Sequence, residues 1–143
     1  MPSLTEEVCR RLLGETRVGV IATVDPDGRP NVVPFVFALD GDTLYSTVDR
    51  KPKSTTQLRR VENIRARPDQ VTVLVDHYEE VWNRVWWVRL RGRGRVIDGG
   101  PDLERAVALL QAKYEQHRDS APQGPAILID ITEWRGWSFR PIE

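Results

Sequence analysis

The residues with the clearest capacity for chemistry form a basic stretch at positions 49–57. It carries Arg50, Lys51 and Lys53 and leads into a capping-box pattern that begins at Ser54. The start of a helix offers free N–H groups and the positive end of the helix dipole, and lysine side chains add charge. The stretch therefore predicts a phosphate-binding site, and the alternative is an ordinary solvated loop.

Two elements flank this stretch and must position it. A strand is expected over residues 43–48, and a helix is expected from Ser54 until Pro68 ends it. The apolar positions of the helix recur at helical spacing, and they are Leu58, Val61 and Ile64. The neighbouring arginines of this helix are expected on its exposed side, where solvation or pairing with glutamate is typical.

The preceding segment predicts an edge strand beside this site. A capping box from Ser3 to Glu6 predicts a first helix that ends at Gly14, and apolar residues predict a strand over 17–24. The Asp-Pro-Asp-Gly turn at 25–28 leads into a strand over 30–39. Because Pro34 lacks an N–H group, it favours a sheet edge or a bulge, which leaves backbone groups free to meet a ligand.

The strand over residues 84–97 has a strict period of two. One of its faces is apolar or glycine, and the other carries four arginines at positions 89, 91, 93 and 95. Three roles remain open for these arginines: a solvated face paired with carboxylates, a subunit interface, or an anion site. Gly92 and Gly94 predict a bend or a close backbone approach, as a barrel requires.

The whole chain, 1–143, is predicted to be one mainly β domain, a six-stranded antiparallel β-barrel with three flanking helices. The expected strands cover 17–24, 30–39, 43–48, 71–76, 84–97 and 126–131. A six-stranded barrel has little interior room, so a ligand is expected on its outside or at a subunit interface.

The composition of the chain argues against several classes of function. Lys+Arg and Asp+Glu are both 21, and this balance argues against a general nucleic-acid binder. The single cysteine, Cys9, is expected to pack in the first helix, and one cysteine with two histidines makes a zinc site improbable. The chain lacks a long apolar run and a signal-like N-terminus, so a cytoplasmic protein without a membrane span is expected.

Most of the chain resembles the split β-barrel, FMN-binding-like proteins of the pyridoxamine 5′-phosphate oxidase-like superfamily. The resemblance rests on four segments, ATVDPDGRPNVVPFVF, GDTLYSTVDRKPKSTTQLRRVENIRARP, VTVLVDHYEEVWNRVWWVRLRGRGRV and RGWSF. Within that superfamily it is closest to the deazaflavin branch of oxidoreductases, which use coenzyme F420.

The resemblance implies a homodimer with two flavin-type cofactors in grooves at the dimer interface. Its cofactor-binding positions correspond to Asn31, Val32, Val33, Pro34, Ser46, Thr47, Val48, Lys51, Lys53, Ser54, Thr55 and Trp87. Trp86 is the alternative to Trp87 as the aromatic residue near the ring. Arg50, Arg59 and Arg60 are candidates to meet the acidic oligoglutamate tail of F420, which flavin mononucleotide (FMN) lacks.

The implied activity is hydride transfer between F420 and an unsaturated or quinone-like organic substrate. The cofactor would supply the chemistry, while the protein would bind and orient it. No catalytic side chain is assigned, and Tyr45, His77 and Tyr78 are the candidates for protonating a substrate. The alternatives are an FMN-dependent oxidoreductase of the same superfamily and a non-catalytic protein that binds F420 or haem.

Overall fold

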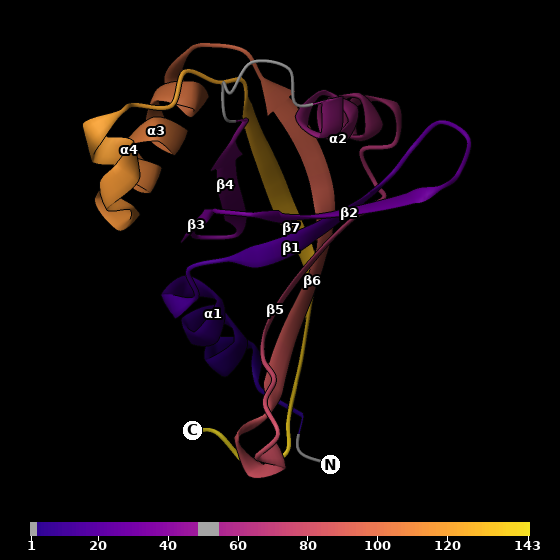
Figure 1. Cartoon of the computed structure of the whole chain (residues 1–143), viewed down its shortest axis with the longest axis vertical. Coiled ribbons are helices and arrows are strands. Elements are labelled where there is room, and N and C mark those ends of the chain that lie inside the picture. Colours follow the sequence, from indigo (N-terminus) through magenta and orange to yellow (C-terminus); the bar gives the residue numbers. More distant parts are fainter. Residues whose placement is uncertain (1–2, 49–54) are drawn as a thin grey trace.

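The computed structural model describes residues 3–48 and 55–143, which form one antiparallel sheet with helices packed around it (Figure 1). The strands are β1 (Gly19–Val24), β2 (Pro30–Phe35), β3 (Ala38–Asp40), β4 (Thr43–Thr47), β5 (Val71–His77), β6 (Trp86–Ile97) and β7 (Ala126–Ser138). The helices are α1 (Glu6–Glu15), α2 (Thr55–Ala66), α3 (Pro101–Lys113) and α4 (Glu115–Asp119), with a 3₁₀ turn, η1, at Trp82–Arg84. The strand order is β2-β1-β5-β6-β7-β4-β3, so the mainly β class and the antiparallel pairing are as predicted.

The sheet has seven strands rather than six, because the strand expected over 30–39 is interrupted at Val36 and Phe37. The backbone of Phe37 bonds to side chains near the end of α3 and not to a neighbouring strand. Its N–H donates to Tyr114 Oη at 3.2 Å, and its carbonyl oxygen accepts from Lys113 Nζ at 2.9 Å. Tyr114 Oη also lies 2.9 Å from the carbonyl oxygens of Phe37 and Arg17.

Three further features of the helices and strands differ from the sequence-based expectation. The N-cap of α1 is Thr5, whose Oγ1 accepts from the N–H of Val8 at 3.2 Å, whereas Ser3 pairs with Trp137 in an isolated bridge. A fourth helix, α4, follows α3. The last strand continues to Ser138, because β7 pairs along the whole length of β6 with one register shift between Arg91 and Gly92.

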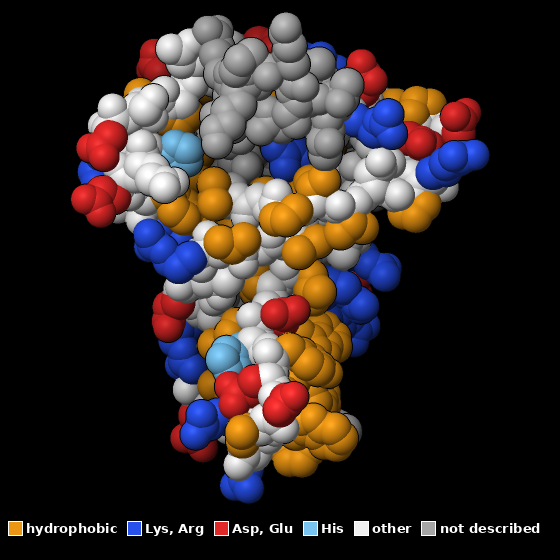
Figure 2. All heavy atoms as spheres, in the orientation of Figure 1, with side chains coloured by type: hydrophobic (Ala, Val, Ile, Leu, Met, Phe, Trp, Pro, Cys, Tyr) orange, Lys and Arg blue, Asp and Glu red, His pale blue; other side chains and the backbone are white. Residues whose placement is uncertain are grey.

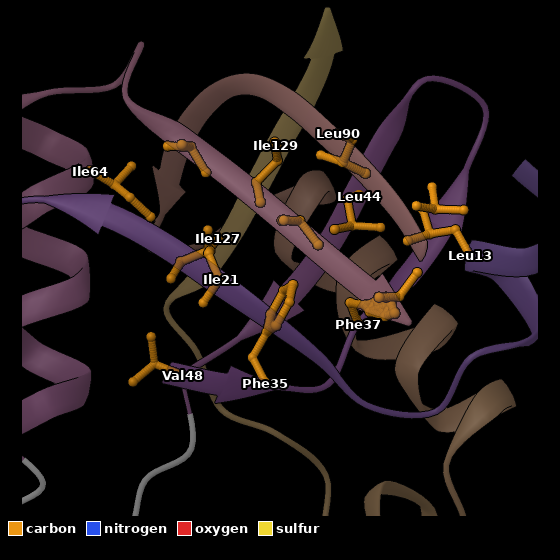
Figure 3. Packing of buried hydrophobic residues seen from close by; sticks show 14 of the residues in the cluster. Leu13, Ile21, Phe35, Phe37, Leu44, Val48, Ile64, Leu90, Ile127 and Ile129 are labelled. Atoms are coloured by element: carbon orange, nitrogen blue, oxygen red, sulfur yellow. The ribbon is translucent and has the colours of Figure 1, made fainter. Parts of the chain in front are cut away.

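Buried apolar side chains from the strands fill one face of the sheet, and α1 and α2 add Leu13 and Ile64 to the same cluster (Figure 3). Phe35 and Phe37 stack with their ring centroids 5.1 Å apart. Cys9 is buried as predicted, and its burial raises the pKa of the thiol. With this face occupied by core side chains, the other face and the strand edges are the surfaces available for a ligand.

No helix in the described part of the chain is both long enough and apolar enough to cross a membrane.

Candidate functional site

Three elements that the sequence assigns to the ligand site contribute to one apolar cluster: β2, the end of β4 and α2. β2 ends the strand order and, among the strands that the structure describes, pairs only with β1, so it is the edge strand that Pro34 predicts. Val32 and Pro34 are exposed, and the exposed fraction of Val32 is 61%. Asn31 and Val33 are half-buried on the opposite side of the strand. Residues 31–34 therefore present an open edge next to the core.

The predicted residues of β4 are buried rather than exposed. Ser46 Oγ donates to the carbonyl oxygen of Val36 at 2.9 Å, which ties β4 to the link between β2 and β3. Thr47 pairs with Ala126 of β7, and the N–H of Val48 donates to the carbonyl oxygen of Pro125 at 2.9 Å. The hydroxyl of Ser46 is thus used within the fold, and contact of these three residues with a cofactor stays a prediction.

The apolar cluster brings β2 and the end of β4 together. Val48 and Phe35 are members of it, and Val33 packs against it. Figure 3 shows Val48 beside Phe35, with Ile64 of α2 on the same side of the core. Two segments that are more than ten residues apart in the chain therefore pack into one cluster, and a ligand groove between them stays a prediction.

The basic stretch itself lies largely outside the described residues. Lys51, Lys53 and Ser54 belong to the segment 49–54, and their phosphate-binding role stays a prediction. Thr55 is the first residue of α2, so a helix does begin within the last part of the stretch, one residue after the expected start at Ser54.

Arg60 is a residue of α2 whose burial the sequence did not predict. It was expected on the exposed side of α2, but only 7% of it is exposed, whereas its neighbour Arg59 is exposed. The Nε atom of Arg60 has no hydrogen-bond partner, and no carboxylate of the described residues forms an ion pair with it. Burial alone lowers the pKa of its guanidinium.

The burial of Arg60 has a signal in the sequence. Arg60 precedes Asn63 by three residues and Ile64 by four, so it shares the face of the helix that they occupy. Asn63 Nδ2 donates to Thr23 Oγ1 of β1 at 3.0 Å, and both side chains are buried. This bond holds the helix against β1, and Arg60 lies one turn closer to the start of the helix.

Trp86 and Trp87 lie on opposite faces of β6. Trp86 packs against the core cluster, whereas Trp87 lies on the outer face with Arg89, whose guanidinium carbon is 5.5 Å from the Trp87 ring centroid. Trp87 is thus the tryptophan with a face available to a ligand. An open cavity of about 370 Å³ borders it, lined by Thr72, Leu74, Asp76, Tyr78, Trp87 and Arg89.

Carboxylates neutralise most of the arginine row on β6, as the paired-face interpretation predicts. Arg95 donates to both oxygens of Asp130, at 2.7 and 3.0 Å, and this pairing lowers the pKa of the Asp130 carboxyl. Arg91 approaches Glu133 and Arg93 pairs with Asp69. Arg89 differs, because its Nε has no hydrogen-bond partner.

The three candidate proton donors do not come together. His77 Nε2 contacts a carboxylate oxygen of Glu79, and the exposed fraction of Tyr78 is 68%. Tyr45 is buried in a different apolar cluster beside α3, and burial raises the pKa of its phenol. The structure therefore adds no support for a catalytic side chain among them. Among the described residues, no three acidic, histidine or cysteine side chains are grouped so that they could hold a metal ion.

The family model of pyridoxamine 5′-phosphate oxidase matches residues 5–138, which is nearly the whole chain. Among curated proteins, none matches the sequence. An FAD-binding protein from Mesorhizobium loti has a similar structure, with a TM-score of 0.69 and 25% identity over 94% of this chain and 95% of that chain.

Two further solved structures share the fold. One is an FAD-binding protein from Mycobacterium smegmatis, with a TM-score of 0.66 and 20% identity over 97% of this chain and 100% of that chain. The other is a haem storage protein from Vibrio cholerae, with a TM-score of 0.68 and 17% identity over 90% of this chain and 92% of that chain.

Proposed function

We propose that this chain, which belongs to the pyridoxamine 5′-phosphate oxidase family, is an oxidoreductase that uses coenzyme F420. The substrate class would be an unsaturated or quinone-like organic molecule. The FAD-binding relative from Mesorhizobium loti supports a flavin-type cofactor and makes FMN the alternative.

One observation carries the proposal: the edge strand β2, the end of β4 and α2 all pack onto the same apolar cluster. A planar ring needs an exposed edge with free backbone groups, and residues 31–34 offer one. The orphaned Nε of Arg60 fits an anionic cofactor, since a buried guanidinium is best matched by an anion. The exposed neighbour Arg59 is suited to an acidic tail that remains in solvent, which favours F420 over FMN.

When bound, the deazaflavin supplies the hydride chemistry, and the residues of this chain bind and orient it. Asn31, Val32, Val33 and Pro34 would lie along the ring. Lys51, Lys53, Ser54 and Thr55 would hold the phosphate with the start of α2. The buried Ser46, Thr47 and Val48 would act by fixing the groove, since the hydrogen bond from Ser46 to Val36 ties β4 to the segment that follows β2.

We also propose that the chain works as a homodimer in which Trp87 of each protomer lies near the cofactor held by the other. Large apolar side chains are exposed on the described surface, and Figure 2 shows hydrophobic side chains gathered on its lower flank. The exposed large apolar side chains of the described surface include Val32, Tyr78, Trp82 and Phe139, with exposed fractions of 61%, 68%, 70% and 43%. Exposed apolar patches of this kind mark interaction surfaces.

A titration with three cofactors tests the function. Purified protein is expected to bind F420 more tightly than FMN, because only F420 offers a tail to the exposed arginines, and quenching of cofactor fluorescence measures both affinities. Haem is the third cofactor in the titration, and its binding is measured by the change in its absorbance. Equal or reversed affinities for F420 and FMN would contradict the F420 assignment, and tight binding of haem alone would favour the non-catalytic alternative.

The mass of the protein in solution tests the dimer. Light scattering at micromolar concentration is expected to give twice the mass of one chain. Replacing Trp82 with a charged residue, Trp82→Glu, is expected to weaken the dimer, because a charge would be desolvated in the apolar interface. Glu104→Gln, at an exposed position on α3, is the control. A monomeric parent protein would rule out a site shared between protomers.

A further inference from the structure

We propose that the cavity between β5 and β6 on the outer face of the sheet is a substrate-binding site, and that it takes a planar aromatic molecule carrying an anionic oxygen. Trp87 would contact the aromatic part, and Arg89 would bind the anion. This inference rests on the proposed function, because it narrows the substrate from an unsaturated or quinone-like molecule to one with a negative charge.

The cavity has the size and the walls of a small-molecule site. Its volume is about 370 Å³, and most of its surface is apolar. Leu74 and Trp87 are half-buried in its wall, and the exposed ring of Tyr78 also lines it. Flat π systems prefer stacked or edge-on contact with aromatic side chains. The cavity is therefore suited to a flat ring system.

Arg89 is the arginine of the β6 row that lacks a carboxylate partner. The arginines at positions 91, 93 and 95 pair with Glu133, Asp69 and Asp130. Arg89 forms no ion pair with a carboxylate of the described residues, and its Nε is buried without a hydrogen-bond partner. An unsatisfied buried donor on a charged group costs free energy. An anion bound in the cavity would remove part of that cost.

The neighbours of Arg89 in the sheet add to the preference for an anion. Arg89 lies opposite Leu74 on β5 and opposite Arg135 on β7. Like charges directly opposite each other repel. The carboxylate of the cavity belongs to Asp76, which lies opposite Trp87, two residues further along β5 than Leu74. A bound anion is therefore expected at the Arg89 end of the cavity, away from Asp76.

The guanidinium of Arg89 is positioned to donate to such an anion. Its carbon lies over the Trp87 ring, 5.5 Å from the centroid. A guanidinium that stacks through its flat face keeps N–H groups at its edge, and these can donate paired hydrogen bonds to an anionic oxygen. With Trp87 of one protomer near the cofactor held by the other, as proposed above, a molecule bound here would lie beside that cofactor.

The first test compares a matched pair of ligands without cofactor. 2-Hydroxy-1,4-naphthoquinone is ionised at neutral pH, and 2-methoxy-1,4-naphthoquinone is its neutral methyl ether. Isothermal titration calorimetry of the parent protein is expected to show binding of the hydroxyquinone that is tighter by about 10-fold, the scale of a hydrogen bond to a charged group. Equal affinities, tighter binding of the ether or binding of neither would overturn the proposal.

Variants of the arginine row test which residue binds the anion. Arg89→Met should bind both quinones with the affinity that the parent has for the ether. Arg89→Lys keeps the charge but loses the planar fork, so it should keep only part of the preference. Arg91→Met, at an exposed position on the same face, is the matched control and should bind like the parent. An unchanged preference in Arg89→Met would overturn the assignment.

Two variants of the cavity wall test the rest of the site. Trp87→Leu should weaken the hydroxyquinone and the ether alike, because it removes the aromatic contact that both share. Asp76→Asn, at an exposed position, should strengthen only the hydroxyquinone, because it removes a negative charge from the cavity. It decides the question if Arg89→Met does not fold, and equal effects of Asp76→Asn on both quinones would contradict an anion in this cavity.

The last test separates this site from the cofactor site. Arg89→Met is expected to keep the affinity of the parent for F420, because the charged groups of the cofactor are assigned to the region of α2. A loss of F420 equal to the loss of the hydroxyquinone would show that the cavity holds the cofactor, and would overturn this inference. If the hydroxyquinone binds through Arg89 but the parent does not bind F420, the aromatic-anion site stands and the F420 assignment fails.

Discussion

Replacing Gly92 with alanine is expected to lower the free energy of unfolding by about 3 kcal/mol or more, because the added methyl group would meet backbone that cannot move aside. A Cβ atom at this position would lie 2.5 Å from the carbonyl oxygen of Asp130 and 2.6 Å from Cγ2 of Ile129. β6 pairs with β5 on one side and with β7 on the other, so neither strand can yield without breaking its pairing. Urea unfolding followed by circular dichroism measures the loss.

Two other glycines provide matched controls for Gly92→Ala. At Gly94 the nearest atom to an added Cβ is Cγ2 of Ile64, at 2.7 Å, and a side-chain end can shift more easily than backbone. Gly94→Ala is therefore expected to cost less than Gly92→Ala. Gly14 is exposed in α1 with nothing within 4 Å, so Gly14→Ala should raise stability by about 0.5–1 kcal/mol. The same cost at Gly92 and Gly94 would contradict the argument from backbone contact.

The features that the sequence predicted well are those with a local cause. The alternation along β6, the turn before β2 and the edge position of Pro34 all follow from neighbouring residues, and each is present in the structure. Gly28 has the positive φ, 85°, that the turn requires, and Asp25 accepts hydrogen bonds from the N–H groups of Asp27 and Arg29. Such features need no information about distant parts of the chain.

The features that the sequence did not predict depend on contacts between distant segments. The split between β2 and β3 is set by Tyr114, which lies 77 residues beyond Phe37 in the chain. The burial of Arg60 depends on how α2 docks on β1, and a basic residue on a helix normally indicates an exposed side. At the candidate site, the edge position of β2 could be predicted, but the inward orientation of Ser46 could not, because its acceptor, the carbonyl of Val36, becomes available only where the strand breaks.

Removing the hydroxyl of Tyr114 should therefore disturb the framework of the site. Tyr114→Phe is expected to lower the free energy of unfolding by about 2 kcal/mol, because it leaves the buried N–H of Phe37 without a partner. The N–H of Phe37 and the carbonyl of Arg17 would lose Tyr114, whereas the carbonyl of Phe37 would keep Lys113. Lys113 cannot replace the hydroxyl as the partner of the Phe37 N–H, because its ammonium group donates hydrogen bonds and has no acceptor.

The same substitution tests how the β2–β3 link supports the groove. Val36 lies in that link and accepts the hydrogen bond of Ser46, so a looser link should also weaken cofactor binding. Urea unfolding measures the first effect and cofactor titration the second. Tyr78→Phe, at an exposed tyrosine in the loop after β5, is the control and should leave stability unchanged. If Tyr114→Phe were as stable as the parent, Phe37 would have to find other backbone partners, and the break between β2 and β3 would have a different cause.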